Sequence, residues 1–189
     1  MSIAEPRLMT VEELDAMPED GKERWLIKGE PREKEMTRRN RDHSRVEGNL
    51  AKLLGNWNDK QPEPRGEVLA GEAGVILGRK PDTTVGVDVC YVSSDLAQSS
   101  PDDEVFLEGA SLLMVEVLSP PDKQEEIAEK VETYVESGVK LIWLVDPRFR
   151  TIMVHRPDAP PQLFNETQTI DAEPHLPGFQ VAVRQIFAR

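Results

Sequence analysis

Two acidic residues lie inside apolar segments of this sequence. Asp88 is in the middle of residues 85–92, and Glu116 is in the middle of residues 112–118. Burying an ionised carboxylate costs several kcal/mol unless a partner charge or a metal ion compensates it. On neighbouring strands the two carboxylates would also repel each other unless a cation lay between them. The pair therefore predicts a site for a hard divalent cation. The alternatives are an acid that faces solvent at a sheet edge and an acid paired with a buried arginine.

Lys130 is the third residue of this candidate site. In a predicted helix over residues 123–137, Ile127 and Tyr134 lie on the buried face, and residue 130 falls on the same face. A lysine there either extends along the helix to water or points to the end of the strand that carries Glu116. Two acids, a metal ion and a lysine could cleave a phosphodiester bond. The metal ion would polarise a phosphoryl oxygen and activate water, and the lysine would orient the water or stabilise transition-state charge.

Hydrophobic periodicity and turn residues predict the elements that must hold these three residues. Asp122 is the expected N-cap of the helix that carries Lys130, and Gly138 is the expected first residue beyond its end. The predicted elements are a helix at 9–17, a strand at 25–30, a helix at 43–58, strands at 67–77, 85–92 and 111–118, a helix at 123–137, and strands at 141–145, 151–156 and 179–183.

This order of elements predicts a mixed α/β (α+β) fold. We expect a central mixed β-sheet flanked by helices, with extra β-strands at the N- and C-terminal ends. The 189 residues are enough for one domain with a sizeable core, but the chain is too short to be interpreted comfortably as two full domains. We therefore interpret residues 1–189 as a single domain, with a core at about 22–156 and a C-terminal β extension at about 157–189.

The charge of the chain is unevenly distributed. Its net charge of −12 argues against a generally basic nucleic-acid-binding protein, because affinity for phosphates depends largely on Lys and Arg. Residues 22–65, however, hold 12 Lys and Arg against 8 Asp and Glu. Within them, four arginines surround Asp42: Arg38, Arg39, Arg41 and Arg45. We expect DNA phosphates to meet this segment, and the alternative is a solvated basic loop.

Three further observations bear on location. The apolar runs are shorter than the roughly 18 residues of a membrane span. The first ten residues do not have the basic and apolar stretches of a signal peptide. The single cysteine, Cys90, cannot form an internal disulfide, which agrees with a reducing compartment. We therefore expect a cytoplasmic protein in which Cys90 is a core residue.

The same residues resemble a known family. The order Asp88, Glu116 and Lys130, with Val-Glu-Val-Leu-Ser-Pro at 115–120 and Trp-Leu-Val-Asp-Pro at 143–147, is similar to the Uma-type family of putative restriction endonucleases. Further matching positions are residues 25–30, His43, Tyr134, Gly138 and residues 176–179. The resemblance implies a restriction-endonuclease-like core of the PD-(D/E)XK nuclease superfamily, a Mg²⁺ (or Mn²⁺) cofactor, a DNA substrate and a homodimer.

The sequence departs from the superfamily pattern at both ends of its motif. That pattern has a lysine two residues after the second acid, where this chain has Leu118. Lys130 takes its place if the lysine has moved to the following helix, as the resemblance implies. The first acid is expected after a proline, but Asp88 has none before it. The literal Pro81-Asp82 lies in a predicted turn, so we interpret Asp82 as a solvated acid outside the site.

The resemblance also implies further ligands and supporting residues. The main-chain carbonyl of Val117 is expected to be a metal ligand beside the two acids. His43 and Glu47 lie one helical turn apart, so they could steady a water or a second metal ion. Glu30 matches a family position after the first strand. For these three side chains the alternative is an ordinary structural or surface role.

These observations lead us to expect a metal-dependent endonuclease that hydrolyses DNA phosphodiester bonds. Two other functions remain open. One is a catalytically inactive nuclease-like module for binding or assembly, which the acidity and the missing local lysine favour. The other is a metal-dependent phosphoesterase acting on a small substrate. A fold alone does not choose among them.

Overall fold

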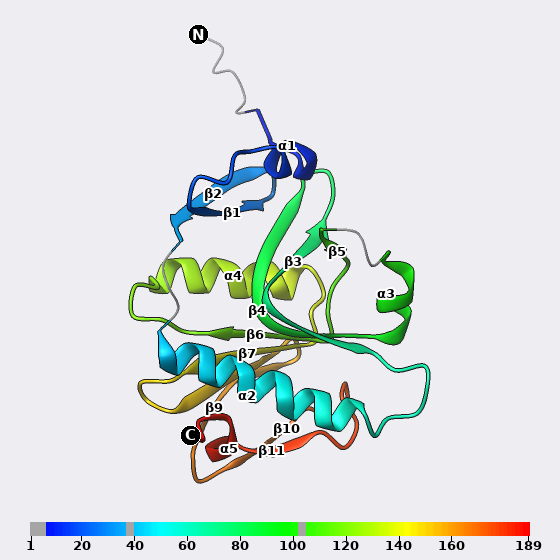
Figure 1. The fold of residues 1–189 in the computed structure, drawn as a ribbon, viewed down its shortest axis with the longest axis vertical. Coiled ribbons are helices and arrows are strands. Elements are labelled where there is room, and N and C mark those ends of the chain that lie inside the picture. Colours follow the sequence, from blue (N-terminus) through cyan, green and yellow to red (C-terminus); the bar gives the residue numbers. More distant parts are fainter. Residues whose placement is uncertain (1–6, 37–39, 102–104) are drawn as a thin grey trace.

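The computed structural model of this chain describes residues 7–36, 40–101 and 105–189. A large mixed β-sheet forms its centre, and helices pack on both faces of the sheet (Figure 1). The helices are α1 (Val11–Asp15), α2 (Arg41–Asn58), α3 (Ser94–Ser99), α4 (Gln124–Glu136) and α5 (Val183–Ile186). The strands are β1 (Lys22–Ile27), β2 (Glu30–Glu35), β3 (Glu67–Gly78), β4 (Thr83–Val92), β5 (Leu107–Glu108), β6 (Leu113–Val117), β7 (Leu141–Asp146), β8 (Thr151–Arg156), β9 (Ala159–Asn165), β10 (Thr169–Asp171) and β11 (Gln180–Ala182). The predicted fold class is confirmed.

The long strand β4 connects the parts of the sheet. The strand order is β2-β1-β4-β6-β7-β8-β9, and β3 also pairs with β4. Strands β6 and β7 are parallel and are joined by α4, whereas β4 is antiparallel to β1, β3 and β6. A parallel pair needs such a crossover connection, which explains why a helix follows β6. The short strands β10 and β11 form a separate sheet.

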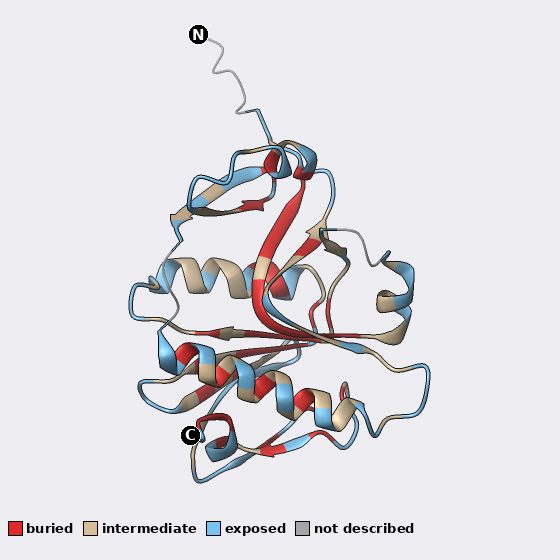
Figure 2. Ribbon diagram, in the orientation of Figure 1, coloured by how far each residue is buried: buried red, intermediate tan, exposed pale blue. Residues whose placement is uncertain are grey.

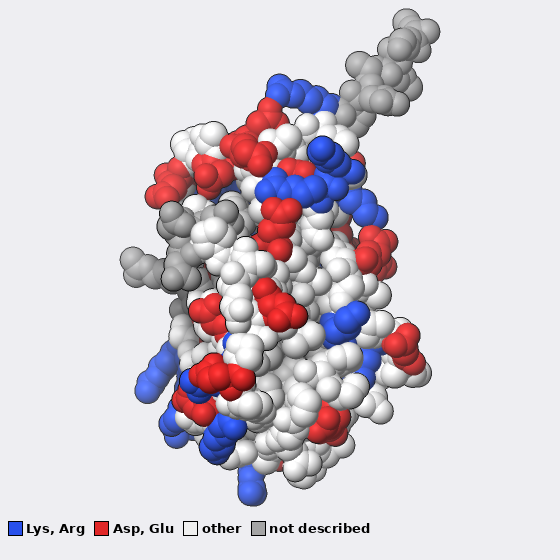
Figure 3. Space-filling model, turned by 90° about the vertical axis from the view of Figure 1, so that its right-hand side faces the viewer, with Lys and Arg blue, Asp and Glu red and all other residues white. Residues whose placement is uncertain are grey.

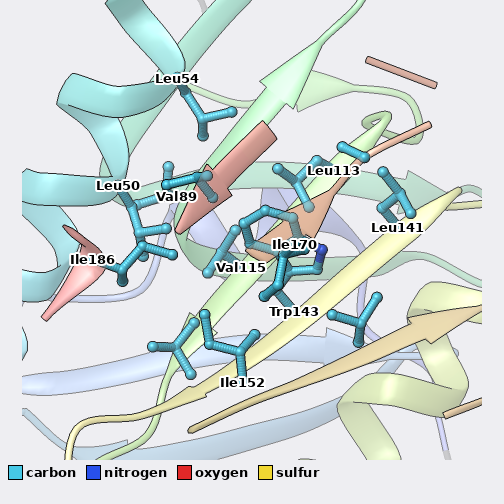
Figure 4. Packing of buried hydrophobic residues seen from close by; sticks show 14 of the residues in the cluster. Leu50, Leu54, Val89, Leu113, Val115, Leu141, Trp143, Ile152, Ile170 and Ile186 are labelled. Carbon is cyan, nitrogen blue, oxygen red and sulfur yellow. The ribbon is translucent and has the colours of Figure 1, made fainter. Parts of the chain in front are cut away.

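Alternate residues of the central strands enter two different cores. On the α2 side, Val115 of β6 packs with Leu50 and Trp143, and Ile186 of α5 belongs to the same core (Figure 4). On the α4 side, Met114 of β6 packs in a second core with Tyr134 and Ile142. Strands covered on both faces are apolar along their whole length. Figure 2 accordingly shows β4 as largely buried, so a carboxylate within it needs a structural reason.

The structure contains strands that the sequence did not predict. Strand β2 is rich in charged residues and pairs with β1 alone, at one edge of the sheet. Strand β9 lies at the other edge and is largely exposed. An edge strand with little burial lacks the apolar alternation that marks a half-buried strand. Among the described residues, no helix is long and apolar enough to span a membrane.

The predicted C-terminal end of α4 is confirmed, and the predicted N-cap is not. Gly138 has a φ of 88° just beyond the helix, the left-handed conformation expected of the residue that follows a C-cap. The N-cap, however, is Lys123, which makes no side-chain capping hydrogen bond, and the prediction of Asp122 was wrong. Asp122 instead accepts a hydrogen bond from the main-chain N–H of Ser119 at 2.6 Å. Its carboxylate therefore stabilises the turn between β6 and α4 rather than the first turn of the helix.

The interpretation of Asp82 as a solvated turn acid was also wrong. Asp82 is only 7% exposed and joins α1 to the β3–β4 turn. It accepts hydrogen bonds from the main-chain N–H groups of Val11 at 2.9 Å and Lys80 at 3.1 Å, and from Arg79 at 3.4 Å. Burial raises the pKa of this carboxyl, but the two main-chain hydrogen bonds and the charge of Arg79 lower it more. The net result is a pKa below the usual range.

Replacing Asp82 by asparagine should lower the free energy of unfolding by about 2 kcal/mol at pH 7, because charge-assisted hydrogen bonds weaken. A carboxyl with a lowered pKa stabilises the fold above its unfolded pKa, and this contribution is lost as pH falls through the folded pKa. The difference between wild type and Asp82→Asn should therefore shrink towards pH 3. Urea unfolding of both proteins at pH 7 and pH 3 measures this difference in the free energy of unfolding. Equal differences at both pH values would contradict a stabilising role of the ionised Asp82 carboxylate.

Candidate functional site

A pocket opens where the neighbours of β4 diverge. Strand β1 pairs with β4 at Thr84, and β6 pairs with it from Val89 to Tyr91. Between these points, the described strands leave that edge of β4 without a ladder. The pocket beside this edge has about 550 Å³ of empty volume, part of it open to solvent. Its walls come from the β1–β2 hairpin, β3, β4, β6, β7 and α4. Asp88, Glu116 and Lys130 all line it.

Asp88 lies at the point where the β4–β6 ladder ends. It is 4% exposed, and its Oδ2 accepts a hydrogen bond from the main-chain N–H of Val117 at 2.7 Å. The carboxylate thus replaces the main-chain partner that Val117 would have if the ladder continued. In a strand, the N–H and C=O of one residue point to the same edge. The Val117 carbonyl therefore faces the edge of β6 where Asp88 lies.

Glu116 and Lys130 form a partly buried ion pair in the same pocket. The Lys130 Nζ donates to Glu116 Oε2 at 2.9 Å and lies 3.4 Å from the carbonyl oxygen of Gly86. The other oxygen, Glu116 Oε1, accepts a hydrogen bond from the hydroxyl of Tyr134. The side chains of Lys130 and Glu116 are 15% and 13% exposed. Lys130 thus points to Glu116 instead of extending along α4 to water.

The charges in the pocket oppose one another. Burial raises the pKa of Glu116, and the nearby Asp88 raises it further, although Lys130 and the hydrogen bond from Tyr134 act against this shift. Burial lowers the pKa of Lys130, but the charge of Glu116 and its hydrogen bond outweigh that effect, so the lysine pKa is raised. The raised pKa of Lys130 favours its charged form. The raised pKa of Glu116, in contrast, disfavours the ionised form of this carboxyl. An added cation would stabilise ionised Glu116.

Helix α2 brings His43 and Glu47 to the other side of Asp88. The ring of His43 is fully buried, with Nε2 3.4 Å from Asp88 Oδ1 and Nδ1 3.7 Å from Glu47 Oε2. Within the described part of the chain, neither ring nitrogen makes a hydrogen bond of good geometry. One ligand atom from each of the three side chains lies within 4.8 Å of the others. Asp88 is therefore shared between two potential binding positions.

Comparison with known proteins identifies the family. The sequence profile of the Uma2 family, described as "Putative restriction endonuclease", matches residues 11–184. The chain belongs to the Uma2 family. A crystal structure of a putative nuclease belonging to DUF820 from Anabaena variabilis ATCC 29413 has a TM-score of 0.78 and 17% sequence identity, and the match covers 95% of this chain and 97% of that chain. At this identity, the likeness shows the fold. A comparison with curated proteins gave no match.

The remaining predicted residues of this Uma2-family chain are Glu30 and the four arginines near Asp42, and those that the structure describes do not line the pocket. Glu30 is exposed, contacts Arg32 at 3.2 Å and does not line the pocket. Arg45 pairs with Asp42 at 2.5 Å in the first turn of α2. Arg41 is exposed and lines a groove next to the pocket. The predicted contacts Arg38 and Arg39 lie outside the described residues.

Three residues of this Uma2-family chain have roles at the site that were not predicted from the sequence. Glu72 of β3 lines the pocket, Tyr134 contacts Glu116, and Arg148 lies beside Arg41 in the adjacent groove. A glycine inside a strand indicates a bulge, so Gly71 was a usable signal for Glu72. Tyr134 was interpreted as part of the buried face of α4 and as a position that matches the family, but no contact with Glu116 was predicted. Arg148 gave no signal, because its place depends on how the turn after β7 meets α2.

Proposed function

We propose that this Uma2-family protein is a metal-dependent endonuclease that hydrolyses DNA phosphodiester bonds. One observation carries the proposal: Asp88, Glu116 and Lys130 come from β4, β6 and α4 and meet in one pocket. Each of these side chains is unusual in its element, since apolar residues surround it in the sequence or in the fold. A cation-binding pocket with an ammonium group beside it explains all three together.

The donor atoms of the pocket fit a hard divalent cation such as Mg²⁺ or Mn²⁺. Asp88 and Glu116 offer carboxylate oxygens, and Val117 offers a main-chain carbonyl oxygen, which are the ligand types these ions prefer. His43 and Glu47 would hold a water or a second metal ion next to Asp88. The support for this part is the buried imidazole of His43, whose nitrogens make no hydrogen bond of good geometry to described groups.

The residues of the pocket have distinct roles in the proposed reaction. When bound, the metal ion would polarise a phosphoryl oxygen and lower the pKa of a water. Lys130, 2.9 Å from Glu116, would donate a hydrogen bond to the attacking water or to a phosphoryl oxygen as negative charge develops. The Tyr134 hydroxyl fixes the orientation of Glu116 before any substrate arrives.

The groove beside the pocket offers a path for a phosphate backbone. Arg41 at the start of α2 and Arg148 after β7 line it together with Leu118, which also lines the pocket. On the face shown in Figure 3, which carries α3, described acidic and basic side chains are mixed with uncharged surface. The described side chains of that face therefore form no continuous basic surface (Figure 3). We also propose a homodimer, in which two identical sites related by a two-fold axis would face the two antiparallel strands of a duplex.

Replacing Arg41 by alanine should weaken DNA binding equally for all sequences and reduce the slope of log K against log salt concentration by about one. The reason is that one phosphate contact, and the counterion it releases, is lost. Fluorescence anisotropy with a labelled duplex at several salt concentrations measures both quantities. Arg65→Ala is the matched control, because Arg65 pairs with Glu63 beyond the far end of α2. Equal effects of the two substitutions would contradict the proposed path.

A plasmid-nicking assay tests the proposed function. Wild-type protein with Mg²⁺ or Mn²⁺ should convert supercoiled plasmid to nicked or linear DNA, and EDTA should stop the reaction. Asp88→Asn should reduce cleavage at least about a hundredfold, since it removes a ligand charge but still accepts the Val117 hydrogen bond. Glu67→Gln, an exposed acid on β3, should have no effect.

The two alternative functions give different outcomes in the same experiment. Binding of DNA without cleavage and without any metal binding would favour a nuclease-like binding or assembly module. Metal-dependent hydrolysis of a small phosphate ester, with plasmid left intact, would favour a phosphoesterase. Plasmid cleavage that survives Asp88→Asn would remove this pocket from consideration.

A further inference from the structure

Asp88 is flanked by two interruptions in the sheet. On one edge, its pairing with β6 stops at Val89. On the other edge, the β3–β4 register runs from Ala70 opposite Val89 to Ala73 opposite Val87. Two residues of β3 therefore face the single residue Asp88, which is the arrangement of a β-bulge. Those two residues are Gly71 and Glu72. Bulges redirect side chains, and this one lies at the pocket.

The bulge directs Glu72 to the same part of the pocket that Lys130 reaches. Glu72 has a φ of 59°, in the left-handed region that residues other than glycine rarely adopt. A Cβ atom added to Gly86 would lie 2.9 Å from Glu72 Oε2. The Glu72 carboxylate thus occupies the space over Gly86, whose carbonyl oxygen is 3.4 Å from Lys130 Nζ. Glu72, Asp88 and Glu116 all line the pocket.

The other side of Asp88 gives an independent indication of a ligand. His43 is fully buried, and neither of its ring nitrogens makes a hydrogen bond of good geometry within the described chain. Its Nε2 lies 3.4 Å from Asp88 Oδ1 and its Nδ1 lies 3.7 Å from Glu47 Oε2, so the unsatisfied ring faces Asp88 from the α2 side. The bulge also approaches this side, since a Cβ atom on Gly71 would lie 3.9 Å from Glu47 Oε1.

We propose that Glu72 is a third carboxylate ligand of the cation that the proposed function assigns to Asp88 and Glu116, and that Gly86 is required to leave room for it. This inference rests on the proposed function. Five acidic and two basic side chains line the pocket, so its carboxylates exceed the positive charge of Lys34 and Lys130 and repel each other unless a further cation lies among them. The bulge and the glycine together bring a third carboxylate to that site, and Val117 adds a main-chain oxygen to the ligands.

Titration of the metal-free full-length protein with Mn²⁺ in a calorimeter tests the inference without relying on activity. Glu72→Gln should weaken Mn²⁺ binding at least about tenfold. Gly86→Ala should weaken it to a similar extent, because the new methyl group displaces the end of the Glu72 side chain and little else. The double variant should bind Mn²⁺ no more weakly than either single variant, since both changes remove the same ligand. Glu67→Gln, on the same strand, should bind like wild type.

Thermal unfolding separates a ligand from a structural residue. Without metal, Glu72→Gln should unfold at the same temperature as wild type or a higher one, because five acidic and two basic side chains line the pocket and the substitution removes one negative charge from it. Glu72→Gly provides a second variant that suits the left-handed backbone and should also lose Mn²⁺ affinity. Unchanged Mn²⁺ affinity in both Glu72 variants would overturn the inference and leave the proposed function intact. Absence of Mn²⁺ binding by wild type would overturn both.

Discussion

Glu116→Gln should lower metal-dependent DNA cleavage by about a thousandfold, which corresponds to about 4 kcal/mol of transition-state stabilisation. Glutamine has nearly the same shape but lacks the charge that binds a metal ion. It can still accept the hydrogen bond from the Tyr134 hydroxyl, so the local geometry should persist. Initial rates of plasmid nicking at saturating Mg²⁺ give the comparison.

The same substitution also leaves the partly buried Lys130 without its anion, which costs stability. A loss of activity through unfolding must therefore be separated from loss of the ligand. The double variant Glu116→Gln/Lys130→Met removes both charges and should recover stability, whereas cleavage should stay lost. Recovery of cleavage together with stability would show that Glu116 only holds the fold.

Lys130→Met should reduce cleavage by about a hundredfold while leaving Mn²⁺ affinity unchanged or stronger. The ammonium group lies 2.9 Å from Glu116, so its positive charge opposes a metal ion at that carboxylate. Removing it takes away transition-state stabilisation but also takes away this opposition. Nicking rates and Mn²⁺ titration calorimetry on the same preparation measure the two effects.

Because cleavage should fall while Mn²⁺ affinity should not, Lys130→Met tells whether Lys130 acts on the substrate or on the metal site. Lys140→Met serves as the matched control, because Lys140 is an exposed lysine just before β7. If Lys130→Met lowered Mn²⁺ affinity tenfold along with cleavage, the lysine would shape the metal site and not act on the substrate. Unchanged cleavage would remove it from the proposed mechanism.

The sequence was informative where a residue contradicted its surroundings. Asp88 and Glu116 were recognisable because each interrupts an apolar strand, and burial makes such a charge costly. Lys130 was recognisable from helix phase, since its distance in sequence from Ile127 and Tyr134 put it on the buried face. The central strands and both long helices were predicted for the same reason, because burial on fixed faces imposes a period on the sequence.

Features that depend on register or on distant partners could not be predicted in this way. Glu72 enters the pocket only because the β3–β4 register shifts opposite Asp88, and a sequence does not reveal the register of two strands. The burial of Asp82 was not predictable, because the main-chain N–H of Val11 that it binds lies 71 residues away in the sequence. Strand β2 is held by its pairing with β1, and its charged side chains show no apolar pattern.

A crystal of the protein soaked in Mn²⁺ and measured for anomalous scattering tests the central claim most directly. The account predicts an anomalous peak in the pocket, within coordination distance of Asp88, Glu116 and the Val117 carbonyl oxygen. The peak should be absent from crystals of Asp88→Asn soaked in the same way. An ordered pocket without a peak at saturating Mn²⁺, or a peak that persists in Asp88→Asn, would contradict the account.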